Sequence, residues 1–272
     1  MTYRGDWHVH SNFCDGKNSL KELLDEAVKK ELNGLGVVFH SHTEFDKSYC
    51  IKKEDIPLFF KEANNLKSEF GEKIKFSAGT EQDYFSEDIP KDADYIIGSC
   101  HYIKVGDNYI PVDETKEIME DAAEKFFNGS FLKLAEVYFS QVATVAKKTK
   151  CDIVGHFDLI TKFDSNENVL FKESREYKNY ALCAADEIMK NCKVFELNTG
   201  VIFRGYKKNP YPADFVLRHL KQKNADIILS GDAHCGDALC FGFDEAEKYL
   251  KSIGFEHRVV LTENGFEKVK LT

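Results

Sequence analysis

Near the start of the chain stands the sequence GDWHVHSNFCDG, residues 5–16. Its first half, 5–10, is the first of several short apolar segments and predicts a β-strand. Side chains two positions apart on a strand point to the same side, so His8 and His10 present two imidazoles at a spacing that one metal ion can use. Asp15 follows a few residues later. The segment therefore indicates a strand whose end carries possible metal ligands.

Along the rest of the chain, short apolar segments alternate with amphipathic helical patterns. Strands are predicted at 5–10, 34–40, 73–80, 94–101, 152–157, 193–199 and 226–231. Helical patterns lie between them, over roughly 19–31, 55–70, 115–149, 173–191, 212–224 and 244–253. This alternation is typical of parallel strands joined by crossover helices. A last hairpin is predicted to turn at Asn264-Gly265.

Seven β/α units in 272 residues favour an α/β fold of the TIM-like barrel type, since a (β/α)8 barrel takes roughly 250 residues. A doubly wound open sheet is the alternative. Neither an internal repeat nor a linker of low complexity interrupts the sequence. We therefore expect one domain over 1–272.

Composition narrows the classes of function. The chain has 37 Lys and Arg against 46 Asp and Glu, a net charge of −9, and 43% hydrophobic residues, which excludes a mainly disordered protein. Without a basic patch, nucleic acid is not an expected partner. No apolar run approaches the roughly 18 residues of a membrane span, and no signal-peptide pattern opens the chain, so we expect a cytoplasmic protein. Eight scattered cysteines are expected to be reduced and mostly buried.

The histidines gather at the carboxyl ends of the predicted strands. Seven of the nine lie there: His8, His10, His40, His42, His101, His156 and His234. Carboxylates share these ends or lie within the strands: Asp15, Glu81, Asp158, Glu196 and Asp232. Because these ends meet on one face of a parallel barrel, we expect a polynuclear metal site there, the alternative being a salt-bridged polar mouth. His219 and His257 lie elsewhere and are interpreted as surface or packing residues.

Mixed imidazole and carboxylate ligands suit zinc, manganese or iron(II). Asp232 and His234 form another pair two residues apart, and so do His40 and His42, although a strand that ends between the last two would turn His40 another way. Three cysteines next to candidate ligands are expected to belong to the core: Cys14, Cys100 and Cys235.

These residues resemble the polymerase and histidinol phosphatase (PHP) superfamily over most of the chain. The motifs that carry the resemblance are HVHSNFCDG from His8, SH at 41–42, AGTEQDY around Glu81, GSCHY around His101, VGHFD around His156 and GDAH at 231–234. The resemblance implies a distorted (β/α)7 barrel with three divalent metal ions at its carboxyl-terminal face.

Carried over residue by residue, the resemblance also implies the metal ligands. The first metal would take His8, His10, Glu81 and Asp232, the second Glu81, His101 and His156, and the third Asp15, His42 and His234. Glu81 would bridge the first two ions. Ser41 stands where the family usually has an acid, so the contact behind His42 is expected to differ.

Within the superfamily the chain is most similar to the histidinol-phosphatase branch. The similar segments are KVGDNYIPVDETK after His101, GHFDLITKF from 155, and ELNTGVIFRGYKKNPYP from 196. Membership would imply a phosphoric monoester hydrolase of histidine biosynthesis that acts on L-histidinol phosphate. Arg204 matches a phosphate-binding arginine, and Lys162 is a second cation where some relatives have arginine. With His42, these two form the implied substrate-binding set.

The chemistry expected from such a site is direct hydrolysis. Two cations bridged by Glu81 lower the pKa of a shared water and so supply hydroxide to phosphorus, while Arg204 and a third cation hold the phosphoryl oxygens. The proton donor to the leaving group stays open among His42, His234 and Asp232. No nucleophile motif of the C-x5-R, G-x-S-x-G or P-loop type is present.

Other assignments stay open at this level. Asp83, Glu196 and Asp113 are candidate acceptors for the ammonium and imidazole of histidinol phosphate. Asp158 either supports the metal site or pairs with Lys162. The alternative functions are a PHP phosphoesterase for nucleotides, oligonucleotide ends or phosphotyrosine, and a metal-binding module without activity.

Overall fold

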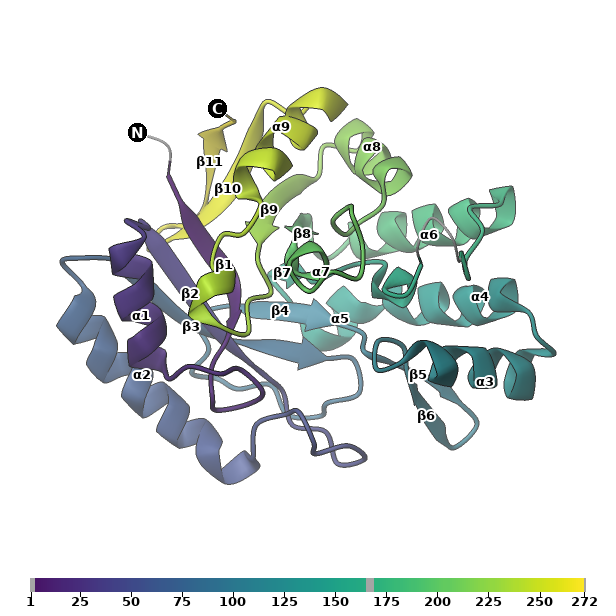
Figure 1. Ribbon diagram of the computed structural model, residues 1–272, viewed down its shortest axis with the longest axis horizontal. Helices are drawn as coiled ribbons and strands as arrows, with labels where there is room; N and C mark the ends of the chain where they lie inside the picture. Colours follow the sequence, from purple (N-terminus) through teal and green to yellow (C-terminus); the bar gives the residue numbers. More distant parts are fainter. Residues whose placement is uncertain (1–2, 165–168, 272) are drawn as a thin grey trace.

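One nine-stranded sheet organises the computed structural model, which describes residues 3–164 and 169–271 (Figure 1). Its strands, in spatial order, are β1 (Gly5–His10), β2 (Gly34–His40), β3 (Lys75–Asp83), β4 (Ile96–Ser99), β7 (Ile153–Val154), β8 (Val194–Asn198), β9 (Asp226–Ser230), β10 (His257–Thr262) and β11 (Gly265–Lys270). Neighbours from β1 to β10 run parallel, and β10 and β11 form the expected antiparallel hairpin.

The sheet curls until its first strand meets the end of the seventh parallel strand. Val9 forms a parallel bridge with Ala233, just past β9. The His10 N–H donates to the Ala233 carbonyl at 2.8 Å, and the Ala233 N–H donates to the His8 carbonyl at 3.0 Å. Lower down, β9 pairs with β10 instead. The barrel is thus closed at its carboxyl end only, which confirms the expected distorted barrel rather than the doubly wound sheet.

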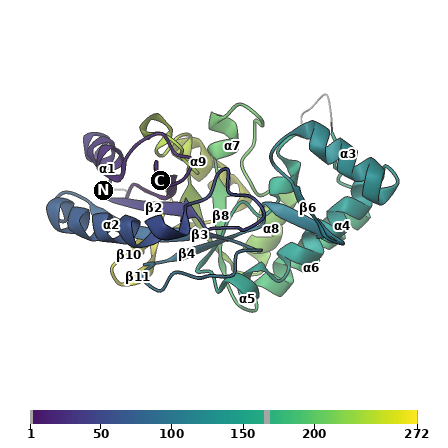
Figure 2. The same ribbon diagram turned by 90° about the horizontal axis from the view of Figure 1, so that it is seen from below.

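Helices lie around the curled sheet (Figure 2). They are α1 (Leu20–Lys29), η1 (Lys53–Asp55), α2 (Ile56–Phe70), α3 (Lys116–Phe127), α4 (Phe131–Val142), α5 (Val145–Thr149), η2 (Leu159–Thr161), α6 (Arg175–Ile188), α7 (Gly200–Phe203), α8 (Asp214–Gln222), η3 (Gly236–Ala238) and α9 (Phe243–Ile253). In α1, Ser19 and Glu22 form a reciprocal capping box, and Leu20, Leu23, Leu24 and Ala27 are buried, as the helical period requires. Within the described ranges, no helix has the length and apolar character to cross a membrane.

Two segments differ from the sequence-based expectation. The helical pattern at 115–149 forms three helices, because Asn128 and Gly129 adopt positive φ angles of 52° and 73° and Ser130 starts a new helix by accepting the Lys133 N–H. The segment after His101 forms a separate hairpin of β5 (Tyr102–Val105) and β6 (Asn108–Pro111).

The barrel interior is layered. Its lower part is apolar and contains Trp7, Val38, Tyr95, Ile97, Ile153, Val194, Ile228, Val259 and Val260. A Cβ atom at Gly5 would lie 1.8 Å from the Trp7 ring, so the indole needs glycine at this position. Above this layer the inward side chains become polar, because the same strands end in histidines and carboxylates. The apolar layer therefore supports the polar end without reaching solvent.

Asp6 holds the closing seam together. Its carboxylate is fully buried, accepting the Gly231 N–H at 2.9 Å, the Cys240 N–H at 3.0 Å and the His8 N–H at 3.4 Å. Burial raises the pKa of this carboxyl to about 6, against the lowering effect of these bonds. At this seam, hydrogen bonds to the Asp6 carboxylate take the place of the backbone pairing that β1 and β9 do not form lower in the barrel.

We therefore expect Asp6→Ala to lower the free energy of unfolding by about 3 kcal/mol, because buried N–H groups lose their acceptor. Urea unfolding followed by circular dichroism measures this difference. Asp25→Ala, on the exposed side of α1, is the matched control and should change stability by less than about 0.5 kcal/mol. Equal unfolding midpoints for the two variants would contradict the role of Asp6.

Candidate metal centre

The buried carboxylate of Glu81 lies at the middle of the polar layer. It extends from β3, and its neighbours on the barrel end lie around both oxygens. Its Oε1 is 2.8 Å from His156 Nε2 and 3.2 Å from His101 Nε2. Its Oε2 is 3.3 Å from His8 Nε2 and 3.4 Å from His10 Nε2. His40 Nδ1 also lies 2.8 Å from Oε2. Each oxygen therefore faces its own set of imidazoles, the division expected of a bridging ligand.

Asp232 lies beside the two histidines of β1 and completes the cluster on that side. Its Oδ1 lies 3.7 Å from His8 Nε2 and 3.6 Å from His10 Nε2. Its Oδ2 accepts a bond of 2.8 Å from Arg204 Nη2, and its backbone carbonyl accepts one of 2.9 Å from Nη1. Burial alone would raise the pKa of this carboxyl. The positive charge of Arg204, and after it that of His8, outweighs burial and holds the pKa well below its usual value.

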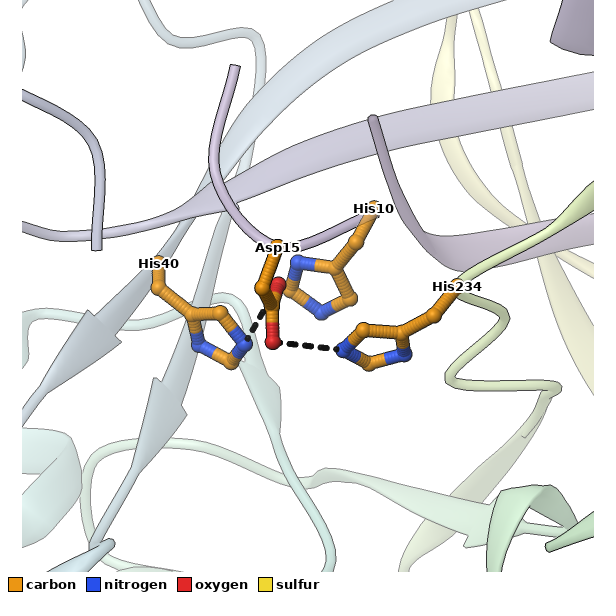
Figure 3. A group of neighbouring side chains, drawn as sticks. All are labelled: His10, Asp15, His40 and His234. Carbon is orange, nitrogen blue, oxygen red and sulfur yellow. Dashed lines mark ion pairs between the residues drawn. The ribbon is translucent and has the colours of Figure 1, made fainter. Parts of the chain in front are cut away.

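A second group lies nearer to solvent and is shown in Figure 3: His10, Asp15, His40 and His234. Asp15 Oδ1 is 3.5 Å from His40 Nε2, and its Oδ2 is 3.2 Å from His234 Nε2. The His10 ring stacks on both neighbouring rings, with centroids 4.1 and 4.4 Å away. One donor atom from each of the four residues lies within 4.8 Å of the others.

His40, rather than His42, occupies this outer group. His40 is the last residue of β2 and is in register with Glu81, so its side chain points into the barrel and its Nδ1 lies 2.8 Å from Glu81 Oε2. The chain leaves the strand after it. His42 contacts the Ile51 carbonyl through Nδ1 at 3.1 Å and lies outside all the groups of donors. The expected third-metal and substrate role of His42 is therefore not supported by its position.

The other expected ligands all fall in these groups: His8, His10, Asp15, Glu81, His101, His156, Asp232 and His234. The residue at the unusual position 41 has a local role, since the Ser41 hydroxyl accepts the Asp83 N–H at 2.8 Å. His219 contacts Asp186 at 2.8 Å on the surface and His257 is exposed, as expected for both. All eight cysteines are free.

Two buried carboxylates stand behind the histidines, and sequence reasoning had not assigned them this role. Glu196 Oε1 is 2.6 Å from His8 Nδ1, and its Oε2 accepts the backbone N–H of His156 at 2.9 Å. Asp83 Oδ2 is 3.2 Å from His101 Nδ1. Such carboxylates fix the tautomer and orientation of a ligating imidazole. The available signal was the alternation of β8, which turns Glu196 to the barrel interior.

The donor set fits divalent cations. Within the described residues, four buried atoms at the centre have no hydrogen-bond partner: His8 Nε2, His10 Nε2, His40 Nδ1 and Glu81 Oε2. Burial opposes charge on the His8 ring, but Glu196 and Glu81 outweigh it and raise its pKa well above the usual value. His8, with other imidazoles, likewise holds the pKa of the buried Glu81 carboxyl well below its usual value. Clustered carboxylates in this low-dielectric interior require compensating positive charge, which metal ions supply.

A cavity of about 390 Å³ opens onto the cluster. Arg204 and Lys162 line it, together with Asp113. The Lys162 ammonium donates to the Asp113 carbonyl at 2.6 Å and lies 3.4 Å from its carboxylate. Asp158 does not pair with Lys162 among the described contacts. Its Oδ2 accepts the Ala213 N–H instead, at 2.8 Å.

Fold and site together define a metal-binding α/β barrel. The chain belongs to the PHP domain family, whose model matches residues 6–200. It is 25% identical to a Schizosaccharomyces pombe protein named "Probable histidinol-phosphatase", over 91% of this chain and 86% of that one. It is 23% identical to the Bacillus subtilis histidinol-phosphatase, over 84% and 92%.

A similar solved structure is the histidinol phosphate phosphatase of Lactococcus lactis, complexed with zinc, L-histidinol and phosphate. The TM-score is 0.74 at 20% identity, and the match covers 97% of this chain and 99% of that one. This likeness confirms the fold.

The positions of His40, at the end of β2, and His42, just after it, give a direct test. His40→Asn should lower the content of bound zinc or manganese, because His40 lies among the donors, whereas His42→Asn should leave it unchanged. Metal content after loading and gel filtration, measured by plasma emission spectrometry, decides between them. A loss of metal in His42→Asn alone would restore the assignment based on the family motif.

Proposed function

We propose that the protein is a metal-dependent histidinol-phosphatase, which hydrolyses L-histidinol phosphate to L-histidinol and phosphate. The observation that carries the proposal is the placement of Glu81 between two sets of imidazoles, one on each oxygen, beside a cavity that also presents Arg204 and Lys162. A phosphomonoester requires both features, a source of nucleophile and cations for its oxygens. The names of the relatives, and the histidinol and phosphate bound to the Lactococcus enzyme, support this substrate.

We propose three metal ions, held by the groups described above with His40 in place of His42. His8, His10, Glu81 and Asp232 would hold the first, Glu81, His101 and His156 the second, and Asp15, His40 and His234 the third. His10 lies close to both the first and the third group, but its Nε2 can bind only one ion. Bound ions would supply the hydroxide nucleophile and positive charge for the phosphoryl group. Zinc, manganese and iron(II) all suit these donors.

Arg204 is positioned to bind the phosphoryl oxygens. Its guanidinium is largely buried beside the cavity, and the Asp232 carboxylate and carbonyl fix its orientation through two bonds. Its Nε has no partner among the described residues, so a donor stays available. Lys162 contributes a second charge as a point cation rather than a planar fork. The two cations therefore bind the anionic end of the substrate.

The alcohol end of the substrate carries an ammonium group, and an acidic stretch of the cavity suits it. Asp46, Asp113 and Glu114 line the cavity together with Tyr49 and Tyr102. We propose Asp113 as an acceptor for the ammonium, since it reaches the cavity while Asp83 and Glu196 are engaged behind histidines. We also propose a cytoplasmic location, where eight free cysteines are stable.

A panel of phosphomonoesters tests the function. After loading with manganese or zinc, the protein should hydrolyse L-histidinol phosphate with a higher kcat/KM than nucleotides, oligonucleotide ends or phosphotyrosine. The released phosphate is measured by a colorimetric assay. A preference for any of these other esters would identify a different PHP phosphoesterase, and no turnover by the loaded protein would indicate a binding module.

Arg204→Ala should lower kcat/KM by an amount that corresponds to a loss of about 2–4 kcal/mol in transition-state stabilisation, because a charge-assisted contact to the phosphoryl group is lost. Metal content, measured on the same samples, should stay at the wild-type value. Arg218→Ala is the matched control, since Arg218 pairs with Asp214 on the exposed side of α8 and should leave kcat/KM unchanged. If kcat/KM of Arg204→Ala equals that of the wild type, Arg204 does not contact the phosphoryl group.

A further inference from the structure

The donors of the metal centre differ in what stands behind them. His8 Nδ1 contacts the Glu196 carboxylate at 2.6 Å, and His101 Nδ1 contacts the Asp83 carboxylate at 3.2 Å. Both carboxylates are buried, and each also accepts a backbone N–H, from His156 and from His101 respectively. These inner imidazoles are therefore held rigidly and made more basic, which strengthens their bonds to a metal ion.

The outer imidazoles have no carboxylate of their own behind them. The contact behind His234 is the Asp232 carbonyl, at 3.0 Å from Nδ1. His40 Nδ1 lies 2.8 Å from Glu81 Oε2, but this carboxylate already serves the inner groups. A peptide carbonyl, or a carboxylate shared with other ions, increases the basicity of an imidazole less than a dedicated carboxylate does.

The inner and outer groups of donors also differ in their negative charge and in their access to solvent. Glu81 and Asp232 serve the inner groups, and both are buried. The outer group has only Asp15 as its own carboxylate, with 34% of that side chain exposed, and the His234 side chain is 27% exposed. A cation in the outer group thus meets less negative charge and more water.

We propose that the metal centre has two affinity classes: an inner pair of tightly held ions around Glu81, and one exchangeable ion held by Asp15, His40 and His234. This inference rests on the proposed metal-dependent function and adds the order in which its ions are lost. The outer ion lies at the mouth of the cavity, so the protein can lose it while keeping the inner pair.

The test is metal release from the loaded wild-type protein, dialysed against chelators of increasing strength and followed by plasma emission spectrometry. One equivalent should be lost to a weak chelator, and two should stay until the chelator is roughly 100-fold stronger. Release of all three equivalents in one step would overturn the proposal.

Two variants assign the classes to residues. Asp15→Asn should bind two equivalents with the tight affinity of the wild type. Glu196→Gln keeps an oxygen acceptor for His8 but removes the charge, so the tight class should weaken by roughly 10- to 100-fold while the exchangeable class is unchanged. If Glu196→Gln is not folded by circular dichroism, Asp83→Asn replaces it. Loss of the tight class in Asp15→Asn would overturn the assignment.

The outcomes separate this inference from the proposed function. Two affinity classes in a protein that hydrolyses no histidinol phosphate would support the metal hierarchy and reject the phosphatase. Hydrolysis by a protein that binds three equivalents with one affinity would do the reverse. A wild-type protein that binds none of the three candidate metals would reject both.

Discussion

The electrostatic balance around Glu81 governs the whole carboxyl end of the barrel. A carboxylate in a dry interior is strongly destabilising unless opposite charge surrounds it, and Glu81 has imidazoles on both oxygens. Those imidazoles come from several strands or from the residues just after them, so the barrel must bring these strand ends to one level for the charge to be fully compensated. The apolar layer below, with Trp7 among its members, provides that rigid level. The same electrostatic requirement therefore constrains both the metal centre and the fold.

Much of this arrangement is readable from the sequence because strand period and chemistry coincide. The strands predicted at 5–10 and 34–40 have those bounds in the structure, and their inward positions are the ones that carry His8, His10 and His40. Buried parallel strands with sharp polar ends are strong local signals. The family motif assigns His42 alone as a ligand. The choice between His40 and His42 depends on the residue at which β2 ends, and strand ends are set by tertiary pairing, here with β3.

Other features depend on contacts that local patterns do not encode. The helical pattern at 115–149 is continuous in hydrophobicity, yet Asn128 and Gly129 interrupt it through left-handed backbone conformations. The hairpin after His101 consists of strands of four residues each, too short to give a period. Glu196 was visible as an acid within a strand, but its role behind His8 follows only from the curvature that brings β8 opposite β1.

The bond between Arg204 and Asp232 bears on how an enzyme of this kind would complete its cycle. An arriving phosphoryl group would meet a guanidinium that is already oriented, so little rearrangement would be needed to engage it. The same carboxylate offsets part of the guanidinium charge. Free phosphate, once an ester bond is cleaved, would therefore be held less firmly than by an unpaired arginine, which would favour the departure of product.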